Sequence, residues 1–248
     1  MELTRDVVSD GALIIMQSKE GYRFGLDAVL LATEIPDVPL GGTVVDLGAG
    51  NGAVGLMIAK RRPDIRVICL EVQRTLVDLL ERNIAENELA SRVTSVYGDV
   101  RQHRLLLKPQ SADLVVSNPP YYRTGQGRPS PNRERAAAHQ ELNGTLRDFV
   151  VAAQYVAKPR ASLKLVIPPM RLSDLNYDVR MSDFLHDTCR FVHARANRDA
   201  YLMEWVFRRG GAPNFAVKPP LILHGDDDQF LPEVTRRFAK AAVEEVRP

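Results

Sequence analysis

The sequence predicts a single α/β domain with a mostly parallel, seven-stranded sheet, helices on both faces and an antiparallel last strand. The chain has 248 residues, 45% hydrophobic and 26% charged, which suits one globular domain with additions. Short apolar runs alternate with segments of helical period, as in parallel strands joined by crossover helices. The first four runs are apolar at most positions, as expected for strands covered on both faces.

Seven apolar runs are predicted to be strands. They are Thr43–Leu47, Arg66–Glu71, Val93–Tyr97, Asp113–Ser117, Leu163–Ile167, Cys189–His193 and Tyr201–Phe207. The short connection Asn197–Asp199 joins the last two, which favours an antiparallel hairpin. Residues 1–35 precede the first predicted strand of the sheet and are interpreted as an N-terminal cap segment. The α/β domain itself is predicted to span residues 36–248.

Two of the intervening segments have apolar residues at helical spacing. One contains Leu76, Leu79, Leu80 and Ile84, and the other contains Leu146, Phe149, Val150, Ala153 and Val156. Thr145 is the predicted N-cap of the second helix, with Asp148 in its first turn. Residues 122–143, with two Gly, two Pro and four Arg, form one long irregular stretch, which in a compact domain is usually functional or disordered.

Composition excludes several classes of protein. No apolar run approaches the roughly 18 residues that a bilayer-spanning helix needs, and the N-terminus lacks the pattern of a secretory signal. Cys69 and Cys189 are interpreted as small core residues. Two lone cysteines without a CxxC spacing argue against a zinc site and fit a reducing compartment. Asp226–Asp228 is interpreted as an exposed acidic loop. We therefore expect a cytoplasmic protein with no membrane span and no metal.

Charge is unevenly distributed along the chain. The formal net charge is +2, but residues 121–218 hold 16 basic and 9 acidic side chains. This region favours a surface that faces a polyanion, although many enzymes with uneven charge bind no nucleic acid.

A glycine-rich turn, Asp46-Leu-Gly48-Ala-Gly50-Asn-Gly52, follows the first predicted strand. Glycines let the chain turn sharply, and the amides of the helix that follows then face a ligand. Glu71 ends the next strand, where a carboxylate can accept hydrogen bonds from two ribose hydroxyls. The segment is therefore predicted to bind an adenosine-containing cofactor.

Two kinds of cofactor compete for this turn. The spacing of Gly50, Gly52 and Gly55 matches the dinucleotide fingerprint, but a lone match is a weak signal. Asp46 lies inside the strand, where a dinucleotide site gains nothing from a buried acid. In a site for S-adenosylmethionine (SAM) this acid can orient the loop and meet the cationic amino-acid end of the cofactor. Asp99 follows the third strand and is predicted to accept a hydrogen bond from the adenine amine, with a simple turn aspartate as the alternative.

The sharpest signal is Asn118-Pro119-Pro120-Tyr121, directly after the fourth predicted strand, at the edge where α/β folds bind ligands. The prolines fix the backbone and remove two donors, which leaves the Asn118 side-chain oxygen and the Pro119 carbonyl as acceptors. Two fixed acceptors can hold both hydrogens of a planar amine and aim its lone pair at a methyl donor. Tyr121 offers an aromatic face for a flat substrate. Alone, the tetrapeptide is equally compatible with a rigid turn.

Taken together, Asp46–Gly52, Glu71, Asp99 and Asn118–Tyr121 resemble the SAM-dependent amino-methyltransferases of the class I, Rossmann-like fold. More narrowly, residues 5–240 resemble the bacterial tRNA1(Val) (adenine-37-N6)-methyltransferase family. The narrower resemblance rests on Gly21–Leu31, on Asn118–Tyr122 with the loop that follows, and on Pro219–His224. The Asn-Pro-Pro-Tyr motif is specific for the chemistry and not for the substrate.

The resemblance implies SAM as cofactor, tRNA as partner and the exocyclic N6 amine of an adenine as the methylated group. It also implies that a cap around Arg23, Phe24 and Asp27 closes over the cofactor. The arginines expected to bind RNA phosphates are Arg123, Arg128, Arg133 and Arg135. Members of the family usually have Ala-Arg-His-Glu after this loop, whereas this chain has Ala138-His139-Gln140-Glu141, so His139 is interpreted as solvent-facing.

Two other functions compete with methylation of RNA. The same motif geometry serves N5-methylation of a glutamine side chain in a protein, because that amide is also planar. The third hypothesis is a non-catalytic, SAM-dependent RNA-binding protein, although pure binding does not need paired acceptors for an amine.

Overall fold

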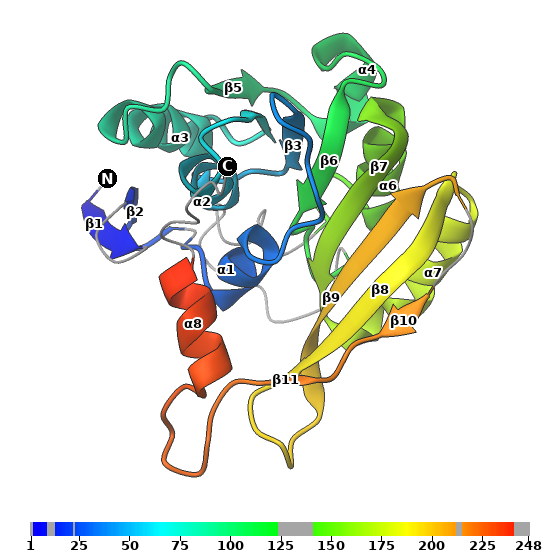
Figure 1. Cartoon of the computed structure of the whole chain (residues 1–248). Coiled ribbons are helices and arrows are strands. Elements are labelled where there is room, and N and C mark those ends of the chain that lie inside the picture. Colours follow the sequence, from blue (N-terminus) through cyan, green and yellow to red (C-terminus); the bar gives the residue numbers. More distant parts are fainter. Residues whose placement is uncertain (1, 9–12, 22, 124–140, 212–214, 241–248) are drawn as a thin grey trace.

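The computed structural model describes residues 2–8, 13–21, 23–123, 141–211 and 215–240. Figure 1 shows its elements. The strands are β1 (Leu3–Val8), β2 (Leu13–Ser18), β3 (Thr43–Leu47), β4 (Arg66–Glu71), β5 (Val93–Tyr97), β6 (Ala112–Ser117), β7 (Ala157–Ile167), β8 (Phe184–His193), β9 (Ala200–Arg209), β10 (Ala216–Val217) and β11 (Leu221–Ile222). The helices are α1 (Leu26–Ala32), α2 (Ala53–Arg61), α3 (Arg74–Glu86), α4 (His103–Leu106), α6 (Leu146–Val156), α7 (Leu172–Arg180) and α8 (Pro232–Lys240), with 3₁₀ turns η1 (Val100–Gln102) and η2 (Pro169–Arg171).

The central sheet has the strand order β10-β8-β9-β7-β6-β3-β4-β5, with β11 also paired to β8. Strands β7, β6, β3, β4 and β5 are parallel neighbours, and β9 runs antiparallel to both β7 and β8. The seven predicted strands correspond to β3–β9, and the antiparallel direction of the last one is confirmed. The short strands β10 and β11, which were not predicted, bring the sheet to nine strands among the described residues.

Both faces of the sheet are covered, and neighbouring residues of one strand show it. Val44 belongs to a core with α1 and α2, whereas Val45 belongs to a second core with α6 and α7. Side chains alternate across a strand, so an uninterrupted apolar run supplies both cores. The predicted helices are confirmed as α3 and α6, and Thr145 with Asp148 forms a capping box at the start of α6.

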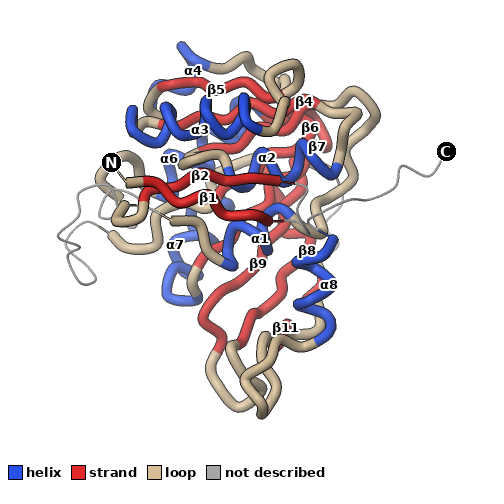
Figure 2. Tube along the Cα trace, turned by 90° about the vertical axis from the view of Figure 1, so that its left-hand side faces the viewer, coloured by secondary structure: helices blue, strands red, loops and turns tan. Residues whose placement is uncertain are grey.

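The N-terminal segment forms an antiparallel hairpin of β1 and β2 outside the central sheet, followed by α1 (Figure 2). The hairpin attaches to α3 through two side-chain amides. Asn87 exchanges hydrogen bonds of 2.8 and 2.7 Å with the backbone of Ile14, and Asn83 does so with Met16 at 2.7 and 3.0 Å. These amides pair with β2 as a neighbouring strand would, which satisfies its free edge.

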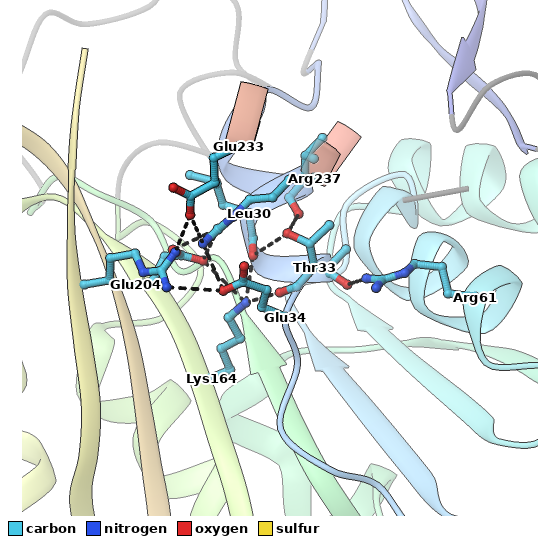
Figure 3. A network of polar contacts seen from close by, with 11 residues as sticks. Leu30, Thr33, Glu34, Arg61, Lys164, Glu204, Glu233 and Arg237 are labelled. Carbon is cyan, nitrogen blue, oxygen red and sulfur yellow. Dashed lines mark hydrogen bonds and ion pairs between the residues drawn. The ribbon is translucent and has the colours of Figure 1, made fainter. Parts of the chain in front are cut away.

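Helix α1 is part of the first core, since Ala28–Ala32 are buried, and its C-terminal end is held by a buried ion network (Figure 3). Lys164 Nζ donates to the carbonyls of Leu30, at 2.7 Å, and Thr33, and lies 3.5 Å from Glu204. Arg237 of α8 also pairs with Glu204, at 3.0 Å. Burying a lysine is tolerated here because two carbonyl oxygens and a carboxylate surround its ammonium group. The network therefore ties α1 and α8 to β7 and β9.

Within the described ranges, none of the helices is long and apolar enough to cross a bilayer. Cys69 and Cys189 are buried and free, and Asp226–Asp228 is exposed, as predicted.

Candidate functional site

A cavity that is partly open to solvent lies at the carboxyl ends of β3, β4, β5 and β6. This is the edge where open α/β sheets bind their ligands. Its lining residues are Gly48, Gly50, Leu70, Glu71, Val72, Gln73, Leu76, Gly98, Val100, Asn118, Pro120, Asn143 and Phe149. The glycine turn, Glu71 and Asn118, singled out from the sequence, thus meet at one cavity.

The glycine turn depends on backbone conformations that favour glycine. Gly48, Gly50 and Gly52 have φ angles of +74°, +59° and +87°. Gly52 is the N-cap of α2, so the turn leads directly into the positive end of a helix. A Cβ atom at Gly48 would lie 3.0 Å from the ring of Phe149, which closes over the loop from α6. The turn is therefore a narrow cradle with backbone close to the cavity.

Asp46 lies behind the glycine turn, only 1% exposed, and accepts a hydrogen bond of 3.1 Å from the Gly55 amide. Burial raises the pKa of Asp46 to about 7, the Gly55 bond opposes the shift, and the charge of Glu71 adds to it. The side chain joins the strand to the helix that follows the turn. A cationic group brought near this carboxyl would favour its ionised form.

Glu71 is buried at the end of β4 and holds both sides of the cavity rim. Its carboxylate accepts hydrogen bonds from the amides of Gly50, at 2.9 Å, and Gln73, at 2.8 Å. Because Glu71 also lines the cavity, its orientation is fixed toward whatever binds there.

Asp99 follows β5 between two lining residues, Gly98 and Val100, but is not itself among the residues that line the cavity in the described part of the chain. Its carboxylate accepts hydrogen bonds from the Arg101 backbone, at 2.8 Å, and from the Arg101 guanidinium. These bonds hold the pKa of Asp99 below its ordinary value. A contact with an adenine amine would need this side chain to leave part of its pairing with Arg101.

Asn118 and Tyr121 converge on Asp27 of α1. Asn118 Nδ2 donates to Asp27 Oδ2 over 2.7 Å, and the Tyr121 hydroxyl donates to the same oxygen over 2.9 Å. Asn118 Oδ1 is buried and has no hydrogen-bond partner among the described residues. Pro119 is buried between Asn118 and the cavity-lining Pro120. Asn118 Nδ2 is thus paired with Asp27, while Oδ1 has no partner in a side chain that lines the cavity.

Sequence reasoning missed Arg171, which supports the turn from the other side. It is 4% exposed, forms ion pairs with Glu141 at 2.6 Å and Asp174 at 2.9 Å, and directs Nη1 to the carbonyls of Pro120 and Tyr121 at 3.4 Å. Its only sequence signal is its place just after the carboxyl end of β7. Arg171 supports the turn through contacts between segments far apart in the sequence, so no local motif identifies it.

The predicted cap residues occupy three different environments. Arg23 turns toward the hairpin, where it pairs with Asp6 at 2.6 Å, and does not line the cavity. Phe24 is partly buried against the first core, and Asp27 reaches the site through Asn118.

The predicted RNA-binding arginines lie mostly outside the described residues. Arg123 is exposed and pairs with Asp174. The others, Arg128, Arg133 and Arg135, and also His139, fall within 124–140.

Across the described part of the chain, no group of three or more His, Cys, Asp or Glu side chains is arranged to hold a metal ion. The cavity instead offers a glycine cradle, a buried carboxylate and a fixed amide oxygen. These groups can hold a cationic, hydroxyl-bearing cofactor beside a planar amine.

Comparisons with known proteins find similarity to methyltransferases. The profile of the methyltransferase small domain matches residues 22–169. A tRNA1(Val) (adenine(37)-N6)-methyltransferase from Porphyromonas gingivalis is 28% identical over 240 residues, 93% of this chain and 92% of that protein. One from Bacteroides fragilis is 29% identical over 227 residues, 90% and 93% of the two chains.

A solved structure supports the fold. The crystal structure of a predicted O-methyltransferase from Agrobacterium tumefaciens superposes with a TM-score of 0.72 at 22% identity, over 89% of this chain and 100% of that one. At this level of identity the similarity concerns the architecture of the sheet and its helices.

Proposed function

Because the chain belongs to the methyltransferase small domain family, we propose that it transfers a methyl group from SAM to the exocyclic N6 amine of an adenine in tRNA. The observation that carries the proposal is Asn118, a cavity-lining residue whose Oδ1 is buried and has no hydrogen-bond partner among the described residues. A buried acceptor without a partner costs free energy unless a ligand supplies the donor. The relatives named as tRNA adenine-N6-methyltransferases support the choice of substrate.

The residues around the cavity fit SAM. Gly48 and Gly50 let backbone approach the cofactor, and Glu71 is oriented to accept hydrogen bonds from the ribose hydroxyls. Asp46, which lies behind the turn and is not itself among the lining residues in the described part of the chain, would face the ammonium group. Asp99 would accept a hydrogen bond from the adenine amine. The bound cofactor supplies an electrophilic methyl group, whose transfer breaks its bond to sulfur, forms the bond to nitrogen and releases one amine proton to water.

The motif residues act on the substrate amine. Asn118 Oδ1 and the Pro119 carbonyl accept hydrogen bonds from its two N–H groups, which turns the nitrogen lone pair toward the methyl group. The prolines keep these acceptors fixed, so catalysis comes from positioning and electrostatics. The Tyr121 ring, held by its hydroxyl on Asp27, provides the face on which the splayed adenine stacks.

The surroundings of the site would bind the RNA. The loop with Arg123, Arg128, Arg133 and Arg135 would supply cations for phosphates, and the N-terminal segment around Asp27 would close over the cofactor. A tRNA substrate implies that the protein works in the cytoplasm.

The proposal is tested by giving the purified protein SAM with a tritiated methyl group, tRNA from cells lacking the modification, and a protein fraction from the same cells. The expected result is label in tRNA that digestion recovers as N6-methyladenosine. Label confined to protein, as N5-methylglutamine, would contradict the proposal and favour the glutamine reaction. Binding of tRNA without label in any fraction would favour a non-catalytic role.

A charge-reversal pair separates RNA docking from chemistry. Arg128→Glu with Arg133→Glu is expected to abolish labelling of tRNA while SAM still binds, because the loop would repel phosphates. Arg66→Glu is the matched control, since Arg66 is exposed at the opposite edge of the sheet, where β4 begins.

A further inference from the structure

Asp27 and Asn118 are 91 residues apart in sequence and meet through one short hydrogen bond. We propose that Asp27 is a positioning residue: its carboxylate holds the Asn118 amide in the one orientation that leaves Oδ1 free to accept a substrate N–H. The inference rests on the proposed function, in which that oxygen receives the amine.

The chemistry of the two groups determines which end of the amide faces which neighbour. An ionised carboxylate only accepts hydrogen bonds, whereas an asparagine amide has a donor end and an acceptor end. Asp27 Oδ2 accepts from Asn118 Nδ2 at 2.7 Å and from the Tyr121 hydroxyl at 2.9 Å, while its Oδ1 accepts from the Ala28 amide at 3.0 Å. The end of Asn118 that faces Asp27 is therefore its NH₂ group.

Rotating the amide by half a turn would reverse both contacts. Asn118 Oδ1 would then oppose the carboxylate oxygen, so two acceptors would face each other, and the NH₂ group would point to the substrate amine, so two donors would. Without the charge on Asp27, both orientations become accessible, and only one of them accepts an N–H. Asp27 thus acts on the reaction through Asn118.

The carboxylate sits on an element that does not move easily. Asp27 is in the first turn of α1, whose residues Ala28–Ala32 are buried. The other end of the helix is held by Lys164, which donates to the carbonyls of Leu30 and Thr33 (Figure 3). Because both ends of α1 are held, the Asp27 carboxylate has a fixed position from which it can orient the Asn118 amide.

The test is the variant Asp27→Asn, with Asp37→Asn, an exposed aspartate just beyond the same helix, as the matched control. We expect kcat on tRNA to fall about tenfold or more for Asp27→Asn, with the Kd for SAM and the KM for tRNA within about twofold of the wild type. In an Asn118→Ala background, Asp27→Asn should cause no further loss, because its effect passes through Asn118. A raised Kd for SAM in both backgrounds would overturn the inference in favour of direct cofactor binding.

A second readout does not need a substrate. In ¹H–¹⁵N spectra the Asn118 side-chain amide, assigned by its loss in Asn118→Ala, should have a downfield proton that moves upfield in Asp27→Asn. An unchanged resonance would overturn the inference whether or not tRNA is methylated. Failure of the wild type to label tRNA, with the resonance shifted as expected, would instead refute the proposed substrate and leave the positioning role standing.

Discussion

Asp46 should make SAM binding depend on pH, and the size of the effect follows from its surroundings. Burial raises the pKa of Asp46 to about 7 in the free protein. About one molecule in eleven therefore carries the ionised form at pH 6, and about ten in eleven at pH 8. When the ammonium group of SAM faces this carboxylate, the ionised form is the one that binds. The Kd for SAM should then be about tenfold larger at pH 6 than at pH 8, or about 1.4 kcal/mol.

Isothermal titration calorimetry at several pH values measures this directly. Binding near pH 7 should release a fraction of a proton, seen as a heat that depends on the ionisation enthalpy of the buffer. Asp46→Asn should bind SAM more weakly at pH 8 and with a Kd that no longer changes with pH. A Kd equal at pH 6 and pH 8 in the wild type would refute the contact and leave Asp46 to hold the Gly55 amide alone.

Unfolding does not explain such a loss of affinity at pH 6. The pKa of Asp46 is raised above its ordinary 3.8, so the folded protein binds this proton more tightly than the unfolded chain. The contribution of Asp46 to the free energy of unfolding is then greatest below pH 4 and falls as the pH rises toward 7. From this group alone, the fold is more stable at pH 6 than at pH 8.

Two further changes test the cradle and the buried network. Gly52→Ala should weaken SAM binding and destabilise the fold, because φ is +87° and the new Cβ would lie 2.3 Å from Leu80. The control is Gly41→Ala, at φ +68° with nothing within 4 Å of the new Cβ. It should lower the free energy of unfolding in urea by only about 1 kcal/mol and leave the Kd for SAM unchanged. Equal effects of the two would contradict the cradle. Lys164→Met should lower the free energy of unfolding by about 3 kcal/mol, whereas Lys158→Met, which breaks a partly exposed pair with Asp113, should lower it by less than about 1 kcal/mol. Burial lowers the pKa of Lys164 from 10.5 to about 8, so the native state releases its proton first, and the wild type should gain stability relative to Lys164→Met between pH 8 and 10.5; a constant difference would contradict this sign.

Local sequence pattern predicted the half of the sheet that contains β3, β4 and β5 well, and the half that contains β7 less completely. Strands β3, β4 and β5 have the predicted bounds, because their apolar runs end abruptly at turns. Strand β7 begins at Ala157, six residues before the predicted start, since Lys158-Pro159-Arg160 has the composition of a loop. Its early residues are a strand because of their neighbours, and a β-bulge between β6 and β7 accommodates them.

The hairpin of β1 and β2 was not predicted, because what stabilises it lies elsewhere in the sequence. Its first strand, Leu3–Val8, does not alternate apolar and polar residues and so lacks the usual strand pattern, and the Asp10-Gly11 hairpin signal that follows it in the sequence was overlooked. The amides of Asn83, on α3, and of Asn87, the C-cap of that helix, satisfy the free edge of β2, and nothing near the hairpin indicates them.

The candidate site divides in the same way. The glycine turn, Glu71 and the Asn118 motif were found because each depends on residues close together in the chain. The contacts of Asp27 with Asn118 and of Arg171 with Pro120 join segments far apart, so only the fold reveals them. The expected cofactor role of Arg23 stays a prediction, although in this structure its guanidinium pairs with Asp6.

The central claim is that Asn118 Oδ1 holds the amine that becomes methylated. Its most direct test is a single-turnover measurement of N6-methyladenosine in tRNA with Asn118→Ala, made alongside a titration of the same preparation with SAM. We expect SAM affinity close to that of the wild type and a methylation rate reduced by about 10²-fold or more. Methylation at the wild-type rate by a variant that lacks this oxygen would contradict the account.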